Sequence, residues 1–267
     1  MEHTMLKKPI DIWMVTYQRK EITENAINYL STRTNYPYRL FVVDNHSSDG
    51  TYEMLKKMEQ DGRVFLTVRF SRNIGIHMAH NIGLGLVDSD LCISTDNDIY
   101  VPDLEGKCWL ERLVDLMNEN QDYGAIACQP HVFLGRSYPE KTGEGVLETG
   151  HCGAVMRMMR TQVAKDVGGW DREWDANRNH EETTICSRIR DRAKLKVGYT
   201  AEIRCYHEFG EDNNWGYKEI HPHEHGHRIP GLSKWATGPD KKGEIWPTPA
   251  KFTEQRHLFN KKTWEKI

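Results

Sequence analysis

The sequence predicts an α/β fold built on a mainly parallel sheet, and two observations carry this prediction. In the first part of the chain, short apolar runs alternate with segments whose apolar residues have helical spacing, which is the pattern of βαβ units. Polar and acidic residues follow directly after these runs, where the carboxyl ends of parallel strands form ligand crevices. We therefore expect a sheet flanked by helices, with a binding site along one edge.

The first part of the chain is predicted to alternate strands and helices in order. The expected strands are Ile10–Thr16, Leu40–Asp44, Val64–Phe70 and Leu91–Thr95. The expected helices are Glu21–Leu30, Thr51–Met58, Ile76–Leu86 and Leu104–Leu116. In the first of these helices the apolar residues fall on one face, as a helix that packs on a sheet requires; they are Ile22, Ala26, Ile27 and Leu30.

The later part of the chain is predicted to contain shorter strands. The pattern changes from Ala125 onward, and the expected elements are a strand at Ala154–Met158, helices at Thr161–Val167 and Glu181–Arg192, and a last strand at Val197–Tyr206. A polar tail rich in His, Gly, Pro and Trp follows this strand.

Composition limits the classes of partner. The chain has 267 residues and a formal net charge of -3, so no overall basic field attracts nucleic acid; this lowers the expectation of a nucleic-acid partner without excluding it. No apolar run approaches the roughly 20 residues needed to span a bilayer, and the N-terminal residues lack a signal-peptide core. We expect a cytoplasmic protein without a membrane span. The six cysteines are scattered and are expected to be reduced core thiols.

Two carboxylates lie one residue apart after the fourth expected strand, in the stretch I-S-T-D-N-D-I-Y-V-P-D at residues 93–103. Asp96 and Asp98 would repel each other unless a cation or hydrogen-bond donors compensate them. Mg²⁺ and Mn²⁺ prefer such oxygen ligands and are often held by one or two carboxylates together with substrate phosphates. The alternative interpretation is a solvated turn formed by Asn97 and Asp98.

The segment V-V-D-N-H-S-S-D-G-T at residues 42–51 places Asp44 at the end of the second expected strand, with a polar turn between it and a helix. This arrangement suits a nucleotide base or ribose, and a simple capped turn is the alternative. The segment S-R-N-I-G-I-H-M-A-H-N-I-G at residues 71–83 contains Arg72, whose planar fork of donors suits a base carbonyl or a phosphate. A surface ion pair is the alternative for Arg72.

The same segment contains residues that permit or bridge close contacts. Gly75 and Gly83 allow another group to approach the backbone closely. The side chains of Asn73 and Asn81 can bridge a loop and a ligand.

Taken in order, V-T-Y-Q-R at residues 15–19, V-D-N-H-S-S-D-G-T, R-N-I-G-x-x-x-A-x-N-x-G and T-D-N-D form the serial pattern of glycosyltransferase family 2, which the chain resembles over about residues 8–210. The resemblance implies the GT-A fold and transfer of a sugar, with inversion, from a nucleoside-diphosphate sugar that we expect to be UDP-linked. The implied nucleotide-binding residues are Thr16, Tyr17, Arg19, Asp44, Arg72, Asn73, Gly75 and Asp96.

The resemblance also implies a bound Mn²⁺ or Mg²⁺. Asp98 would be its direct ligand, and Asp96 would bind the ribose or a metal-bound water. His207 ends the last expected strand, where several GT-A enzymes have a histidine metal ligand; a buried core histidine is the alternative.

The acceptor side of the resemblance rests on three segments. G-H-C-G-A-V-M-R at residues 150–157 and V-G-G-W-D at residues 167–171 resemble the floor of the sugar pocket. H-E-E-T-T-I-C-S-R at residues 180–188 resembles the segment that carries the general base, which implies Glu182 or its neighbour Glu181. A carboxylate is needed there because the acceptor hydroxyl must lose its proton. Favourable charges at a helix start are the alternative.

We expect a domain at residues 1–210, with a nucleotide-binding half at 8–100 and an acceptor half at 101–210, followed by a C-terminal lid or extension at 211–267. The histidine-rich run at residues 221–227 is expected to belong to that lid, and the basic stretch at 187–196 to be a solvated helix face or to meet an acidic acceptor. The acceptor stays open between a glycan, a small molecule, a protein and a modified nucleobase.

Three other functions compete with this hypothesis. A retaining GT-A glycosyltransferase would have much the same nucleotide motifs. A sugar-phosphate nucleotidyltransferase would need a glycine-rich loop after the first strand, and V-T-Y-Q-R-K has no glycine. A non-catalytic protein that binds a nucleotide or carbohydrate would have no need to keep Asp96, Asp98 and Glu182 together.

Overall fold

The computed structural model describes residues 7–130, 132–133, 136–137, 144–170 and 181–207. The main sheet consists of β1 (Ile10–Thr16), β2 (Tyr38–Asp44), β3 (Leu66–Arg69), β4 (Leu91–Asp96), β5 (Ile99–Tyr100), β6 (Tyr123–Pro130), β9 (Val146–Thr149), β10 (Arg157–Arg160) and β11 (Lys196–His207). A separate small sheet pairs β7 (Val132–Phe133) with β8 (Arg136–Ser137). The helices are α1 (Lys20–Arg33), α2 (Thr51–Gln60), α3 (Ile76–Leu86), α4 (Trp109–Glu119), α5 (Thr161–Asp166) and α6 (Glu181–Arg192).

The main sheet is parallel in its first half and mixed in its second half. Its strand order is β3-β2-β1-β4-β10-β6-β11-β5, with β9 paired to β11. The first four strands in this order, β3, β2, β1 and β4, are parallel, as the sequence predicts. Beyond β4, β11 is parallel to β6, but β10 is antiparallel to β4 and β6, and β5 and β9 are antiparallel to β11, so this half is less parallel than expected.

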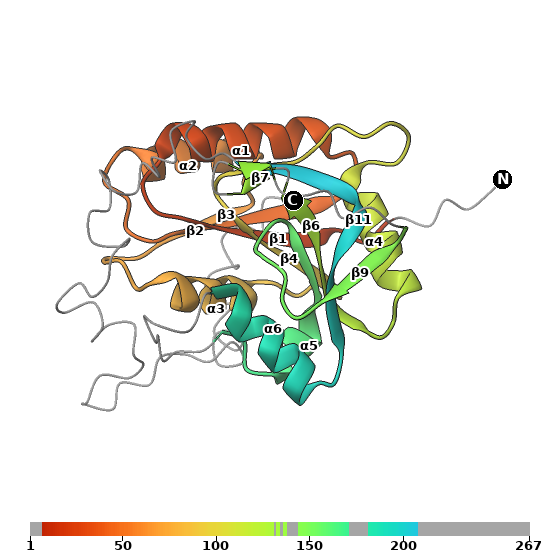
Figure 1. The fold of residues 1–267 in the computed structure, drawn as a ribbon. Coiled ribbons are helices and arrows are strands. Elements are labelled where there is room, and N and C mark those ends of the chain that lie inside the picture. The colour runs from red at the N-terminus through yellow and green to blue at the C-terminus, as the bar shows by residue number, and fades with distance from the viewer. Residues whose placement is uncertain (1–6, 131, 134–135, 138–143, 171–180, 208–267) are drawn as a thin grey trace, which may run out of the picture.

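Two helical layers cover the sheet, one on each face (Figure 1). Helices α1, α2 and α4 pack on one face, and α3, α5 and α6 pack on the other. Strand β1 serves both cores because successive side chains point to opposite faces. Ile12 and Met14 contribute to the first core, whereas Trp13 and Val15 contribute to the second.

Helix α3 approaches the sheet more closely than a side chain at Gly83 would allow. A Cβ atom built on Gly83 would lie 2.1 Å from Cδ1 of Trp13, which is far inside contact distance. The close approach expected for this glycine is therefore directed at the core. It allows α3 to pack closely on β1, which in turn positions the loop that precedes the helix.

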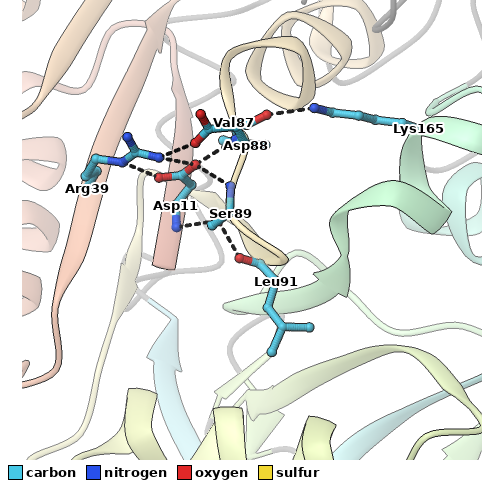
Figure 2. Close-up of polar contacts among 7 residues, drawn as sticks. All are labelled: Asp11, Arg39, Val87, Asp88, Ser89, Leu91 and Lys165. Carbon is cyan, nitrogen blue, oxygen red and sulfur yellow. Dashed lines mark hydrogen bonds and ion pairs between the residues drawn. The ribbon is translucent and has the colours of Figure 1, made fainter. Parts of the chain in front are cut away.

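At the amino end of the sheet, the fully buried carboxylate of Asp11 joins three segments (Figure 2). Its oxygens accept hydrogen bonds from Nε and Nη2 of Arg39 on β2, at 2.6 and 2.8 Å. They also accept from the backbone N–H groups of Asp88 and Ser89, at 2.8 and 3.0 Å. Figure 2 shows Arg39 reaching Asp88 as well, so β1, β2 and the turn before β4 are held together at this end.

Asp11→Asn should destabilise the fold, because the amide cannot replace a carboxylate that accepts from both Arg39 and backbone N–H groups. Removing one partner of a buried ion pair costs about 3–5 kcal/mol. Since Arg39 is partly exposed, we expect the lower end of that range in the free energy of unfolding, measured by urea denaturation. Asp88→Asn, at a more exposed carboxylate of the same cluster, should cost less. Equal losses would show that burial of Asp11 is not what makes it important.

Most element boundaries differ from the sequence predictions by a few residues, and two element starts are displaced by three residues or more, each after a residue with positive φ. Helix α4 begins at Trp109 and not at Leu104, because the preceding residues bend through Gly106, whose φ is 80°. Strand β10 begins at Arg157 and not at Ala154, because Met156 has a φ of 46° and interrupts extended structure.

Two other predictions can be compared with the structure. All six cysteines are buried and free, which confirms the prediction of reduced core thiols. Among the helices that the structure describes, none is long and apolar enough to cross a bilayer.

Candidate active site at the carboxyl edge of the sheet

Strands β1, β2 and β4 end side by side, and their last residues carry the predicted site. Thr16 lies opposite Asp44 in the register of β1 and β2, and Val15 lies opposite Asp96 in the register of β1 and β4. The chain continues from β1 to β2 on one side, whereas β4 lies on the other side of β1. This reversal of strand order is the switch point at which open α/β sheets bind ligands.

Asp98 lies between a histidine and an arginine from distant parts of the chain. Its Oδ1 is 3.1 Å from Nε2 of His207, the last residue of β11, and its Oδ2 accepts a hydrogen bond of 2.7 Å from Nη1 of Arg19. Burial alone would raise the pKa of Asp98, but His207 and Arg19 outweigh it and hold this pKa well below the usual range. The side chains of Asp98 and Arg19 are both 8% exposed, so the interpretation as a solvated turn is wrong.

Asn97 holds the Asp96–Asp98 turn against the start of the chain. Its Nδ2 donates to Oγ1 of Thr16 at 3.1 Å and to Oγ1 of Thr23 at 2.9 Å. All three side chains are buried. Thr16, which is predicted to line the nucleotide pocket, therefore also positions the carboxylate turn.

The loop between β1 and α1 is pinned to the loop between β2 and α2. The backbone at Gln18 and Arg19 has φ values of 57° and 65°, which residues other than glycine rarely adopt. The backbone N–H of Gln18 donates to Oγ of Ser47, and its side-chain amide exchanges two hydrogen bonds with Ser48. These contacts hold the backbone of Arg19 where its side chain can reach Asp98, while Tyr17 is half-buried beside it.

Asp44 pairs with Arg69, an arginine that lies outside the predicted site residues. Nε of Arg69 lies 3.4 Å from Oδ2 of Asp44, and Nη2 of Arg69 donates to the carbonyl of Ser47 at 2.6 Å. Burial raises the pKa of Asp44, although the N–H of Ser47 and the charge of Arg69 act against that. Arg69 is the last residue of β3 and lies opposite Asp44 in register, a relation that only strand pairing shows. Arg72 is exposed in the following loop.

The loop before α3 is closed by asparagines. Nδ2 of Asn45 donates to Oδ1 of Asn73, which also accepts the N–H of Gly75. Oδ1 of Asn45 accepts the N–H of Ile74. Gly75 has a φ of 80°, a conformation that favours glycine, and it precedes the first residue of α3. Asn73 thus bridges two loops, and its predicted role toward a nucleotide stays a prediction.

Three sequence motifs and strand β1 meet around Trp170. Asn81 of α3 exchanges two hydrogen bonds with the backbone of Trp170, at 2.8 and 3.0 Å. The ring of His80 stacks on the indole of Trp170, and the guanidinium of Arg157 lies 5.3 Å from its ring centre. Trp13 donates to Nδ1 of His80 at 3.1 Å. These buried contacts join the motif at residues 150–157 to the turn at residues 167–170.

Glu181 and Glu182 are the first two residues of α6, and their side chains lie outside the described part of the structure. Two arginines of the basic stretch on this helix fix the preceding turn. Arg188 donates to the carbonyls of Gly168 and Gly169 at 3.0 Å, and Arg192 donates to that of Val167 at 2.8 Å. The basic stretch is therefore not simply a solvated face. The C-terminal extension, including residues 221–227, also lies outside the described residues.

The donor set at Asp98 fits a divalent cation in part. A buried carboxylate and an imidazole lie within hydrogen-bond distance, and both are ligand types that Mn²⁺ accepts. Within the described ranges no group of three or more His, Cys, Asp or Glu side chains is arranged to hold a metal, and Asp96 does not join the pair. A diphosphate and water would have to supply the remaining ligands.

Comparison with known proteins identifies the family. The model of "Glycosyl transferase family 2" matches residues 11–168, which include most of β1, the Asp44 turn, the α3 loop and the Asp96–Asp98 turn. The chain belongs to glycosyltransferase family 2. This confirms the resemblance that the serial motifs indicate.

Two curated relatives have the same name, undecaprenyl-phosphate 4-deoxy-4-formamido-L-arabinose transferase. The one from Serratia proteamaculans is 37% identical over 87 residues, which cover 32% of this chain and 26% of the relative. The one from Yersinia enterocolitica is 33% identical over 119 residues, which cover 43% and 35%. The chain thus matches only about a third or less of the length of these relatives.

Solved structures share the fold at low sequence identity. TarS of S. aureus in complex with UDP-GlcNAc has a TM-score of 0.60 at 14% identity. The match covers 80% of this chain and 64% of the TarS chain. The mannosyltransferase PcManGT of Pyrobaculum calidifontis, with GDP-Man and Mn²⁺, has a TM-score of 0.59 at 16% identity and covers 76% and 57%. GalNAc-T7 with UDP, GalNAc and Mn²⁺ has a TM-score of 0.61 at 14% identity and covers 75% and 44%. The family 2 chain therefore has the GT-A fold.

Asp98 should stabilise the fold only while its carboxylate is ionised. Because its pKa is lower in the folded chain than in the unfolded chain, the contribution is fully present above the ordinary aspartate pKa of about 3.9 and is lost as the pH falls below it. Asp98→Asn should lower the free energy of unfolding at pH 7, and its difference from wild type should shrink between about pH 4 and pH 3.

Urea denaturation at several pH values measures this difference. Asp90→Asn, at an exposed carboxylate, serves as the control and should have little effect at any of these pH values. A deficit in Asp98→Asn that stays constant with pH would contradict the assigned pKa shift.

Proposed function

We propose that this family 2 protein is a metal-dependent glycosyltransferase that transfers a sugar from a nucleoside-diphosphate sugar, UDP-linked in our hypothesis, to an acceptor hydroxyl with inversion. The observation that carries the proposal is the pairing of Asp98 with His207 at the carboxyl edge of the sheet. Asp44 lies at the same edge, two strands from β4, with its carboxylate buried. A cation site next to a base-binding carboxylate is the arrangement that a nucleotide diphosphate requires.

Different residues at the carboxyl edge of the sheet would bind the cation and the base. Asp98 and His207 would hold the cation, which when bound would neutralise charge on the diphosphate leaving group. Asp44 and Arg72 would contact the base, in a pocket lined by Thr16 and Tyr17. Because the Asp44 side chain is packed against Arg69, we expect Arg69 to orient this carboxylate.

Deprotonation of the acceptor is assigned to the start of α6. A hydroxyl that attacks the anomeric carbon must lose a proton, and a carboxylate can take it. Glu182 is our first choice for this general base and Glu181 the second. The arginines of α6 that hold the turn after α5 would keep the start of this helix next to the floor around Trp170.

The names of the curated relatives favour a second candidate acceptor, a polyprenyl phosphate. A phosphate oxygen is already ionised near neutral pH, so its attack on the anomeric carbon needs no general base. The two acceptor classes therefore make different demands on Glu182, although the donor site would be the same.

Asp98→Ala should abolish cation-dependent binding of the nucleotide, because it removes the proposed direct ligand. Isothermal titration with UDP, in the presence and absence of Mn²⁺, measures the effect. Asp103→Ala is the matched control, since Asp103 is an exposed carboxylate of the same stretch. If Mn²⁺ still increases UDP affinity in Asp98→Ala, the cation site lies elsewhere. If GDP binds and UDP does not, the proposed base is wrong.

Glu182→Gln should leave UDP and Mn²⁺ binding nearly intact and reduce transfer to a hydroxyl acceptor by about 10²–10⁴-fold, the usual contribution of a general base. Glu181→Gln is the control and should cost less. Release of nucleoside diphosphate measures the rate, and NMR of the product identifies the anomer. Small, equal losses with a retained anomer would contradict both the base and inversion. Full activity of Glu182→Gln on a polyprenyl phosphate would support the second acceptor.

A further inference from the structure

The guanidinium of Arg19 is bound to one oxygen of the carboxylate that a cation at Asp98 would need. Both side chains are 8% exposed, and Nη1 of Arg19 lies 2.7 Å from Oδ2 of Asp98. The other oxygen, Oδ1, is 3.1 Å from Nε2 of His207. Both oxygens of the carboxylate are therefore already in contact with a nitrogen atom.

A divalent cation and this guanidinium compete for Asp98. A cation between Asp98 and His207 would lie next to the positive charge of Arg19, in a buried place where water screens the repulsion poorly. One carboxylate also cannot fully compensate three positive charges. Arg19 would have to release Asp98 as the cation binds.

The exchange would move only the side chain of Arg19, because its backbone is held in place. Gln18 is pinned through Ser47 and Ser48, and the carbonyl of Arg19 accepts the N–H of Thr23 in the first turn of α1. A change of rotamer about a fixed Cα atom would therefore be enough, at the edge where we place the diphosphate. Its planar fork of donors matches phosphate oxygens.

We propose that Arg19 is the resident counter-ion of Asp98, and that it exchanges this carboxylate for the donor diphosphate when a divalent cation binds. The inference rests on the proposed function and adds a coupling to it. Arg19 lowers the affinity for the cation alone, and the diphosphate relieves this competition. Cation and nucleotide thereby favour each other's binding, by the same factor in both directions.

Isothermal titration of Mn²⁺ into Arg19→Met, with and without UDP, tests the exchange. Without nucleotide, the variant should bind Mn²⁺ about tenfold more tightly than wild type, within the usual range of coupling between sites. UDP should increase Mn²⁺ affinity by a larger factor in wild type than in the variant. Lys20→Met removes an exposed neighbouring charge and should behave like wild type.

A second readout and a second variant complete the test. Mn²⁺ should raise the melting temperature of Arg19→Met more than that of wild type, because the variant leaves Asp98 without its guanidinium. Arg19→Lys keeps the charge but loses the planar fork, so its Mn²⁺ affinity should lie between the two, and it serves where Arg19→Met does not fold.

The outcomes separate this inference from the proposed function. If wild type binds Mn²⁺ with UDP, and Arg19→Met binds Mn²⁺ alone no more tightly than wild type does, the exchange is wrong and the cation site stands. If wild type binds no Mn²⁺ even with UDP, the proposed cation site itself fails.

Discussion

The carboxylate of Asp98 is the contact on which the arrangement of the site depends. It lies just after β4, and it reaches Arg19 in the loop after β1 and His207 at the end of β11. These three residues come from the start, the middle and the end of the described chain. Without the negative charge of Asp98, the buried guanidinium of Arg19 would lose this ion pair. The loop after β1 and the last strand are therefore both positioned by one side chain.

Much of the fold follows from the alternation of apolar residues, because burial on a sheet or a helix imposes a period that the sequence displays. The parallel strands and the helices α3 and α6 lie where this pattern predicts them. The second half of the sheet was less predictable. Strand β10 inserts in antiparallel direction between β4 and β6, a pairing that depends on contacts far apart in sequence. The starts of α4 and β10 depend on single backbone conformations at Gly106 and Met156.

The candidate site was predictable as a set of motifs but not as a set of contacts. The carboxylates Asp44, Asp96 and Asp98 could be identified because each lies at or just after the end of an expected strand. The pairing of Asp44 with Arg69, and of Asp98 with Arg19, could not, because strand register and a left-handed loop decide them. At the amino end of the sheet, the buried carboxylate of Asp11 holds β1, β2 and the turn before β4 together. The candidate site lies at the opposite, carboxyl edge.

The most direct test of the cation site is X-ray diffraction from crystals grown with UDP and Mn²⁺, measured at an energy where manganese scatters anomalously. The account predicts an anomalous peak within bonding distance, about 2–2.5 Å, of the Asp98 carboxylate and Nε2 of His207, with the diphosphate on its open side. Arg19 should be turned away from Asp98 in that complex. A manganese peak elsewhere in the presence of bound UDP, with the contact between Arg19 and Asp98 intact, would contradict the account.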